Sequence, residues 1–98
     1  MENKHVVTYL NGRLASNEVL IITQEECAEV SQAISKILRF GPSGHYENKT
    51  NKERLEEEIG DLLCMVEILY EKGIISQSMV EASSVFKRDK LKQWSNIL

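Results

Sequence analysis

The sequence predicts an all-α fold in which a small helical bundle is completed by association with further copies of the chain. Apolar residues recur at steps of three and four, as they do along one side of an amphipathic helix. Helix-breaking residues are few, five Gly and one Pro, and they cluster at a small number of joints. No run of four to eight residues alternates clearly enough to predict a strand. These three observations indicate helices joined by short turns.

Composition indicates one small domain over residues 1–98. The part of it that carries the sequence motifs spans about residues 17–94. The net charge of −3 argues against a nucleic-acid-binding surface, because such surfaces are basic. The longest apolar run, Val19–Ile22, is far shorter than the roughly 20 residues of a membrane span. The N-terminus lacks the layout of a secretion signal, and Cys27 and Cys64 form no CxxC pair. We therefore expect a cytoplasmic protein with no membrane or nucleic-acid partner and with both thiols buried.

The first predicted helix spans about Asn17–Arg39. Ser16 is a candidate N-cap, and the capping-box pattern of Thr23–Glu26 leaves a later start open. Gly41–Pro42 ends the helix, because Gly suits a C-terminal turn and Pro cannot continue it. A loop of about ten residues is expected to follow.

The capping box Thr50–Glu53 predicts the start of a second helix, which stops at Gly73. A third helix is expected over about Ser76–Trp94, with Ser78–Glu81 as an alternative start. Residues 3–13 are expected to form a further short helix.

Two acidic residues of the second helix share the side that its apolar residues occupy. At about 100° per residue, Glu58 lies in the middle of the apolar stripe and Asp61 lies about 60° from it. The apolar residues of that stripe are Leu55, Leu62, Met65, Val66, Ile68 and Leu69. The glutamates expected on the opposite face are Glu53, Glu56, Glu67 and Glu71.

The first helix repeats this arrangement. Glu26 lies among apolar residues, and Glu29 falls about 60° away on the same side. Glu25 and Lys36 lie at the edge of the stripe. The stripe itself consists of Val19, Ile22, Val30, Ala33 and Ile37.

Each helix is thus expected to carry two inward carboxylates three residues apart. Side chains at that spacing are neighbours on the helix surface, so both can contact the same ligand. Four buried like charges are costly, since each desolvated ion costs several kcal/mol and mutual repulsion adds to this. The cost falls if some carboxyls are protonated, if they reach solvent or pair with lysines, or if multivalent cations lie between them. The lysines in question are Lys36, Lys87 and Lys90. Two such pairs on two helices favour the cations.

The expected ion follows from the donor atoms. All four donors are carboxylate oxygens, so Mg²⁺, with Mn²⁺ as a substitute, is the natural choice. Mg²⁺ held in this way commonly completes its coordination shell with substrate phosphates. The sequence therefore indicates phosphate-ester or phosphoanhydride chemistry.

The acidic residues also resemble a known family signature. Glu25–Glu29 followed by Glu58–Asp61 is similar to the EExxE…ExxD pattern of the MazG-like all-α nucleoside triphosphate pyrophosphohydrolases. The flanking segments Ala33–Gly41 and Asn51–Glu57 resemble those of short, often phage-encoded members. The resemblance covers about residues 17–94.

The resemblance implies an enzyme that converts a nucleoside triphosphate to the monophosphate and pyrophosphate, in a helical fold that dimerises or tetramerises. By position, the ligands of Mg²⁺ would be Glu26, Glu29, Glu58 and Asp61. Glu25 would orient the attacking water or support the ligands. Family members use basic residues of the last helix on the substrate, and Lys87 and Lys90 are the preferred pair here. Lys36 would contact phosphate or form a salt bridge.

A second apolar face on the first helix also predicts association. Leu20 and Ile21 turn away from the side that Glu26 occupies. An additional apolar face on a small helical chain usually meets a symmetry-related copy. We expect a homodimer or homotetramer with the metal site near the subunit boundary.

Base recognition and the choice among related activities stay open at this point. His45, Tyr46 or Trp94 would stack on a base, or they are ordinary loop and packing residues. One alternative is a helical binding module without catalytic activity. Another is a related enzyme on the same scaffold, such as a phosphoribosyl-ATP pyrophosphohydrolase or a dimeric dUTPase.

Overall fold

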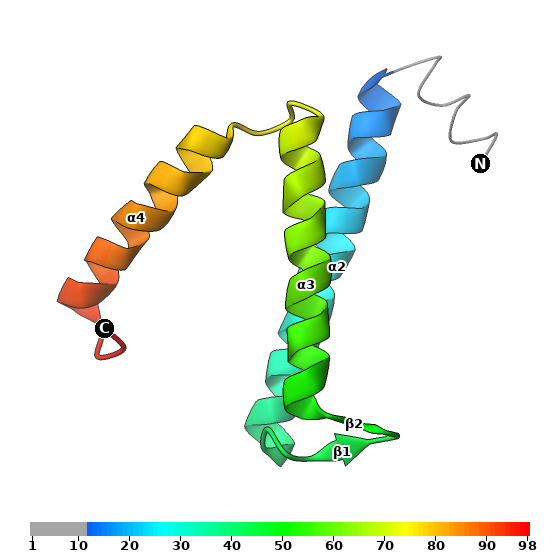
Figure 1. Ribbon diagram of the computed structural model, residues 1–98, viewed down its shortest axis with the longest axis vertical. Helices are drawn as coiled ribbons and strands as arrows, with labels where there is room; N and C mark the ends of the chain where they lie inside the picture. The colour runs from blue at the N-terminus through cyan, green and yellow to red at the C-terminus, as the bar shows by residue number, and fades with distance from the viewer. Residues whose placement is uncertain (1–11) are drawn as a thin grey trace. The chain divides into compact units, whose positions relative to one another are not determined.

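The computed structural model describes residues 12–98, with side chains from Asn17 onward. The described residues form three helices and two very short strands, labelled in Figure 1. In chain order they are α2 (Gly12–Phe40), β1 (His45–Tyr46), β2 (Lys49–Thr50), α3 (Asn51–Glu71) and α4 (Gln77–Trp94). The all-α prediction is confirmed, whereas the short helix expected over residues 3–13 lies almost wholly outside the described residues. The chain divides into two compact units, one ending at Ile68 and the other comprising Leu69–Leu98.

Helix α2 begins earlier than predicted. Both proposed starts are wrong, because Ser16 lies inside the helix and Thr23 is a mid-helix residue. The Thr23 hydroxyl donates a hydrogen bond to the Val19 carbonyl at 2.8 Å, a bond that Thr makes within helices and that a capping pattern does not reveal. The predicted end is confirmed. Gly41 has a φ of +85° and its N–H donates to the Ile37 carbonyl at 2.8 Å.

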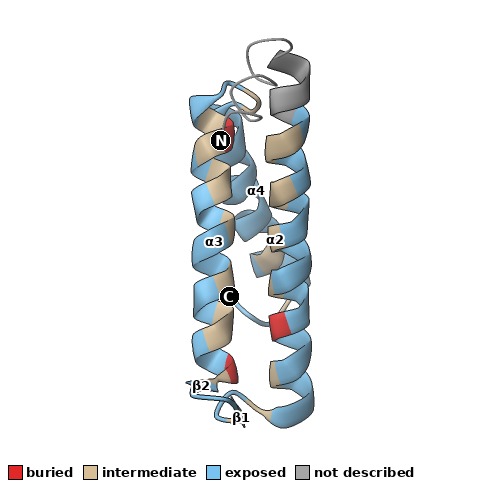
Figure 2. Ribbon diagram, turned by 90° about the vertical axis from the view of Figure 1, so that its right-hand side faces the viewer, coloured by how far each residue is buried: buried red, intermediate tan, exposed pale blue. Residues whose placement is uncertain are grey.

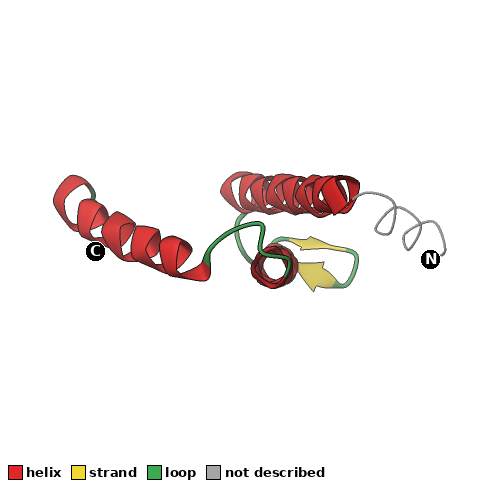
Figure 3. Cartoon of the chain, turned by 90° about the horizontal axis from the view of Figure 1, so that it is seen from above, coloured by secondary structure: helices red, strands yellow, loops and turns green. Residues whose placement is uncertain are grey.

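The expected loop after α2 contains a small β-hairpin. Strands β1 and β2 are antiparallel, with His45 opposite Thr50 and Tyr46 opposite Lys49. They lie beside α3, which Figure 3 shows end-on. Strands of two residues are too short to display an alternating pattern, so they could not be predicted from the sequence.

The predicted start of α3 is confirmed in both of its hydrogen bonds. The Thr50 N–H donates to Glu53 Oε1 at 2.9 Å, and the Glu53 N–H donates to Thr50 Oγ1 at 3.0 Å. These bonds lower the pKa of the Glu53 carboxyl from its ordinary value. The hairpin and α3 are therefore joined by a fixed corner at Thr50.

The joint between α3 and α4 also forms as predicted. Gly73 has a φ of +69°, its N–H donates to the Tyr70 carbonyl at 3.0 Å, and Ile74 N–H donates to the Leu69 carbonyl at 2.9 Å. Helix α4 then begins with Ser76 as its N-cap, whose hydroxyl accepts from the Met79 N–H at 3.4 Å.

Helices α2 and α3 lie side by side and run in opposite directions (Figures 1 and 2). Their facing sides carry most of the buried and half-buried residues, drawn red and tan in Figure 2. The stripe predicted on α2 is buried or half-buried at every position, and so is the stripe predicted on α3. The glutamates expected on the outer face of α3 are all exposed. The helical phase read from the sequence is therefore confirmed.

The prediction of buried thiols is wrong. Cys27 and Cys64 are both exposed free cysteines in this chain. Cys27 directly follows Glu26, and Cys64 directly precedes Met65, and both neighbours lie on the facing sides of the helices. A single step along a helix turns a side chain by about 100°. Cys27 comes directly after Glu26, so it is turned out of the α2–α3 interface.

Several large apolar side chains are exposed, as expected for Leu20 and Ile21, which are 47% and 55% exposed. Helix α4 has no buried residue, and its apolar residues include Met79 and Phe86, 67% and 62% exposed. None of the described helices has the length and apolar character that crossing a membrane requires.

The N-cap of α3 should contribute measurably to stability. Thr50→Ala removes the hydroxyl that accepts from Glu53 N–H, so we expect the free energy of unfolding to fall by about 1 kcal/mol. Thr50→Ser keeps the hydroxyl and should keep most of the stability. Urea denaturation of the three proteins measures this, and equal losses in both variants would contradict the capping role.

Candidate metal centre

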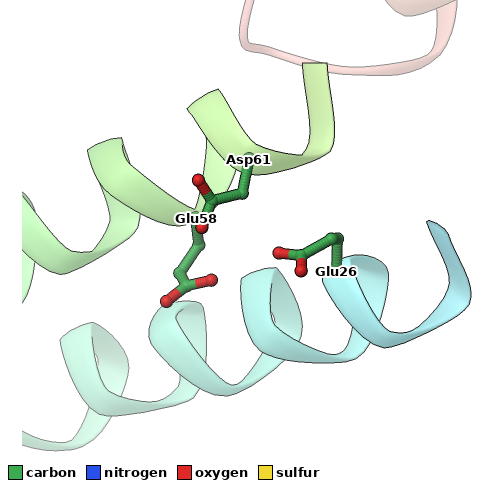
Figure 4. Close-up of side chains that lie close together, drawn as sticks. All are labelled: Glu26, Glu58 and Asp61. Atoms are coloured by element: carbon green, nitrogen blue, oxygen red, sulfur yellow. The ribbon is translucent and has the colours of Figure 1, made fainter. Parts of the chain in front are cut away.

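Three carboxylates meet between α2 and α3. Glu26 comes from α2, while Glu58 and Asp61 come from α3 three residues apart. One oxygen of each lies within 4.8 Å of an oxygen of the other two. Figure 4 shows the three side chains directed into the space between the two helices. Glu26 and Glu58 are half-buried and Asp61 is exposed, so the cluster opens to solvent on one side.

Apolar packing places these carboxylates together. On α2, Glu26 shares its side with half-buried Val30 and buried Ala33. On α3, Glu58 lies between half-buried Leu55 and Leu62. The hydrophobic effect brings these faces into contact, and the acidic residues are carried into the interface with them.

The cluster is electrostatically strained. The pKa of Glu58 is raised above its ordinary value, first by desolvation and then by the negative charges of Glu29, Asp61, Glu26 and Glu57. A raised carboxyl pKa means that the surroundings disfavour the charged form. A proton or a bound cation would relieve this repulsion.

No basic side chain of the described residues relieves it. The ion pairs found among residues 17–98 link Lys49 to Glu57, Lys52 to Glu56, Arg54 to Glu47 and Lys92 to Asp89. None of them includes Glu26, Glu58 or Asp61. Pairing of these carboxylates with lysines, the alternative left open by the sequence, is therefore not observed in the described part of the chain.

The donor set fits a hard divalent cation. Mg²⁺ binds oxygen at 2.0–2.1 Å, so two ligands on opposite sides of the ion are about 4.2 Å apart. The three oxygens all lie within 4.8 Å of one another, so small side-chain rotations would bring them to the spacing of such ligands. All three donors are carboxylate oxygens, and no thiolate or imidazole belongs to the cluster, which disfavours zinc.

Two other acidic residues expected at the site lie outside this cluster. Glu29 is exposed and is not one of the three grouped residues, although its charge is the largest electrostatic contribution to the raised pKa of Glu58. Glu25 is also exposed and outside the group. The structure therefore brings together three of the four residues predicted as ligands.

The predicted phosphate-binding lysines occupy two different units. Lys36 lies near the end of α2, with its Nζ 5.7 Å from the centre of the Tyr46 ring. Lys87 and Lys90 lie on α4 in the second unit, and Lys90 Nζ is 4.7 Å from the centre of the Phe86 ring.

Arg54 is a polar residue near the site that was not predicted from the sequence. Its Nη2 donates to the Tyr46 carbonyl at 2.8 Å and its guanidinium lies 5.1 Å from the centre of the Tyr46 ring. Its Nε is buried and has no hydrogen-bond partner among the described residues. Arg54 is four residues before Glu58, about 40° from it around the helix, so an arginine beside the apolar stripe was the signal that could have revealed it.

Comparison with models of protein families identifies the family of this chain. A model of the MazG nucleotide pyrophosphohydrolase domain matches residues 15–92. The chain belongs to the MazG family. Comparison with curated proteins and with solved structures found no match.

Membership of the MazG family identifies the coarse chemistry as that of nucleotide pyrophosphohydrolases, which are hydrolases. The matched range of the MazG domain contains every acidic and basic residue that the sequence placed at the site. The carboxylate cluster thus lies within the part of the chain that defines the family.

Glu58 should make the stability of the metal-free MazG domain depend on pH. The folded state keeps the Glu58 proton to higher pH than the unfolded state, whose carboxyl has the ordinary pKa of 4.5. The free energy of unfolding should therefore fall as pH rises from about this value to the raised pKa of the folded state, and Glu58 adds no further change above that pKa. Glu58→Gln removes the titration, so the stability of the variant relative to the wild type should rise across this range and then level off.

Urea denaturation in the presence of a chelator, at a series of pH values, measures this difference. Glu67→Gln is the matched control, because Glu67 is exposed on the outer face of the same helix. Parallel pH profiles of the wild type and Glu58→Gln would refute electrostatic strain at Glu58.

Proposed function

We propose that this chain is a divalent-metal-dependent enzyme that converts a nucleoside or deoxynucleoside triphosphate to the monophosphate and pyrophosphate. The observation that carries the proposal is the meeting of Glu26, Glu58 and Asp61 from two helices of a MazG domain. No ion pair with a described basic residue neutralises them, so the cluster is suited to a cation that accompanies a phosphate substrate.

Mg²⁺ is the proposed ion, with Mn²⁺ as a substitute, because the donors are hard oxygens. Glu26, Glu58 and Asp61 would hold it, and Glu29 would join them as a fourth ligand by a change of rotamer. The charge of Glu29 already reaches Glu58, which supports this assignment. The bound ion would neutralise charge on the phosphoryl oxygens and lower the pKa of a water.

The remaining polar residues have supporting roles in this proposal. Glu25, next to Glu26 in sequence, would orient the attacking water or hold a ligand in place. Lys36, Lys87 and Lys90 would offset the negative charge of the triphosphate. Lys36 is available for this role, since it forms no ion pair with residues 17–98.

We further propose that the chain works as a homodimer or homotetramer in which the two compact units form one domain. The exposed apolar residues Leu20 and Ile21 on α2, and those of α4, support this. A cytoplasmic location is proposed as well, because both cysteines are free thiols, as is usual in a reducing compartment.

The central test is a panel of nucleoside triphosphates, with release of monophosphate and pyrophosphate measured in Mg²⁺ and then in a chelator. We expect turnover in Mg²⁺ and none in the chelator. Glu58→Gln and Asp61→Asn should each lower kcat by at least about a hundredfold, because each removes a charged group that holds the ion at the reacting phosphates.

Glu67→Gln serves as the control on the same helix and should change activity by less than about twofold. Equal losses in the inner and outer variants would contradict the site. Absence of pyrophosphate release from every triphosphate would instead favour a helical binding module without catalytic activity.

The proposed assembly has its own test. Sedimentation velocity at micromolar concentration should show a dimer or tetramer, and Ile21→Glu should shift it towards smaller species because a charge cannot be buried in an apolar contact without cost. A folded wild-type monomer at that concentration would contradict the proposal.

A further inference from the structure

A cavity separate from the carboxylate cluster lies at the end of the first unit where α2 stops and α3 begins. Its volume is about 320 Å³, at the lower end of the range for small-molecule sites. The lining residues are Lys36, Phe40, Gly44, His45, Tyr46 and Asn51. They come from the last turns of α2, the loop that follows it, strand β1 and the first residue of α3.

The walls of this cavity are held by hydrogen bonds. Asn51 is buried, its Nδ2 donates to the Gly41 carbonyl at 3.0 Å, and its N–H donates to the Gly44 carbonyl at 2.8 Å. Gly44 leaves no room for a side chain, because a Cβ there would lie 2.9 Å from Asn51 Nδ2. Arg54 fixes the backbone of Tyr46 through its bond to the carbonyl. The cavity is therefore formed before any ligand arrives.

Its chemistry is aromatic and cationic. Phe40 and Tyr46 are 64% and 60% exposed, and His45 is exposed beside them. Lys36 and Arg54 both lie over the Tyr46 ring, at 5.7 and 5.1 Å from its centre. Exposed rings beside positive charges are the features that bind a nucleobase by stacking next to its phosphates.

The cavity lies within reach of the carboxylates. Lys36 is ten residues after Glu26 on α2, and Asn51 is seven residues before Glu58 on α3. At 1.5 Å per residue these separations are about 15 and about 10 Å along the helices. A nucleotide whose phosphates lie at the cluster is long enough to place its base at the hairpin.

We propose that this cavity binds the base of the nucleotide, with the base stacked on Tyr46 and the Lys36 ammonium turned from that ring to the phosphates that follow the base. The proposal rests on the function proposed above and adds the direction in which the substrate lies: phosphates at the middle of α2 and α3, base at the hairpin. Stacking is tolerant of base identity, so Tyr46 contributes affinity for nucleotides in general.

The test compares Tyr46→Ala with Tyr46→Phe, which keeps the ring. Tyr46→Ala should raise KM for the triphosphate about tenfold and leave kcat within about twofold. Tyr46→Phe should behave as the wild type. Calorimetry should show weaker binding of the nucleoside monophosphate to Tyr46→Ala and unchanged binding of pyrophosphate, which has no base.

An unchanged KM in Tyr46→Ala, with the wild type active, would overturn the base site while the hydrolase function stands. Weaker binding of both the monophosphate and pyrophosphate would also overturn it, since the cavity would then hold phosphate. If the wild type is inactive on every triphosphate, the hydrolase proposal fails. Calorimetry with the nucleoside monophosphate then tests whether the cavity binds a base. Binding by the wild type that is lost in Tyr46→Ala supports the base site. No binding by the wild type, or equal binding by both proteins, overturns the base site.

Discussion

Electrostatic repulsion between carboxylates at a largely apolar helix interface is the constraint on which the site depends. Burial of apolar side chains holds α2 against α3, and the same faces carry Glu26, Glu58 and Asp61. The raised pKa of Glu58 records the resulting conflict. A protein that needed only stability would replace these carboxylates with apolar residues, because unpaired charges at an interface cost free energy. A ligand that carries positive charge would offset this cost.

The turns matter because they set the register of the two helices. Gly41 ends α2, Asn51 ties the loop between Gly41 and Gly44 to the start of α3, and the reciprocal bonds of Thr50 and Glu53 begin α3 at one residue. One turn of a helix is 5.4 Å, more than the whole spread of the carboxylate oxygens, so a shift of one turn would take Glu26 away from its partners. The same corner forms the aromatic cavity, which links the geometry of metal binding to that of base binding.

Much of this arrangement could be predicted from the sequence because helical periodicity is strong and local. The inner stripes, the capping box at Thr50 and the stop at Gly73 all follow from residue type and spacing. The start of α2 could not, since Thr23 bonds within the helix as readily as at its end. Periodicity also gives only the angle around an axis, so it placed Glu29 with the other carboxylates but could not tell that its side chain is exposed. The cavity at Tyr46 depends on long-range contacts of Asn51 and Arg54, which no local pattern contains.

Crystals grown with Mn²⁺ would reveal whether the carboxylate cluster binds a divalent ion, because anomalous scattering locates the ion without any assumption about activity. We expect a peak between Glu26, Glu58 and Asp61, with an oxygen of each at bonding distance and the Glu29 carboxylate turned towards it. The metal site is contradicted if the three side chains extend into solvent and the only peaks lie elsewhere, or if no peak is present at a concentration that saturates ordinary Mn²⁺ sites.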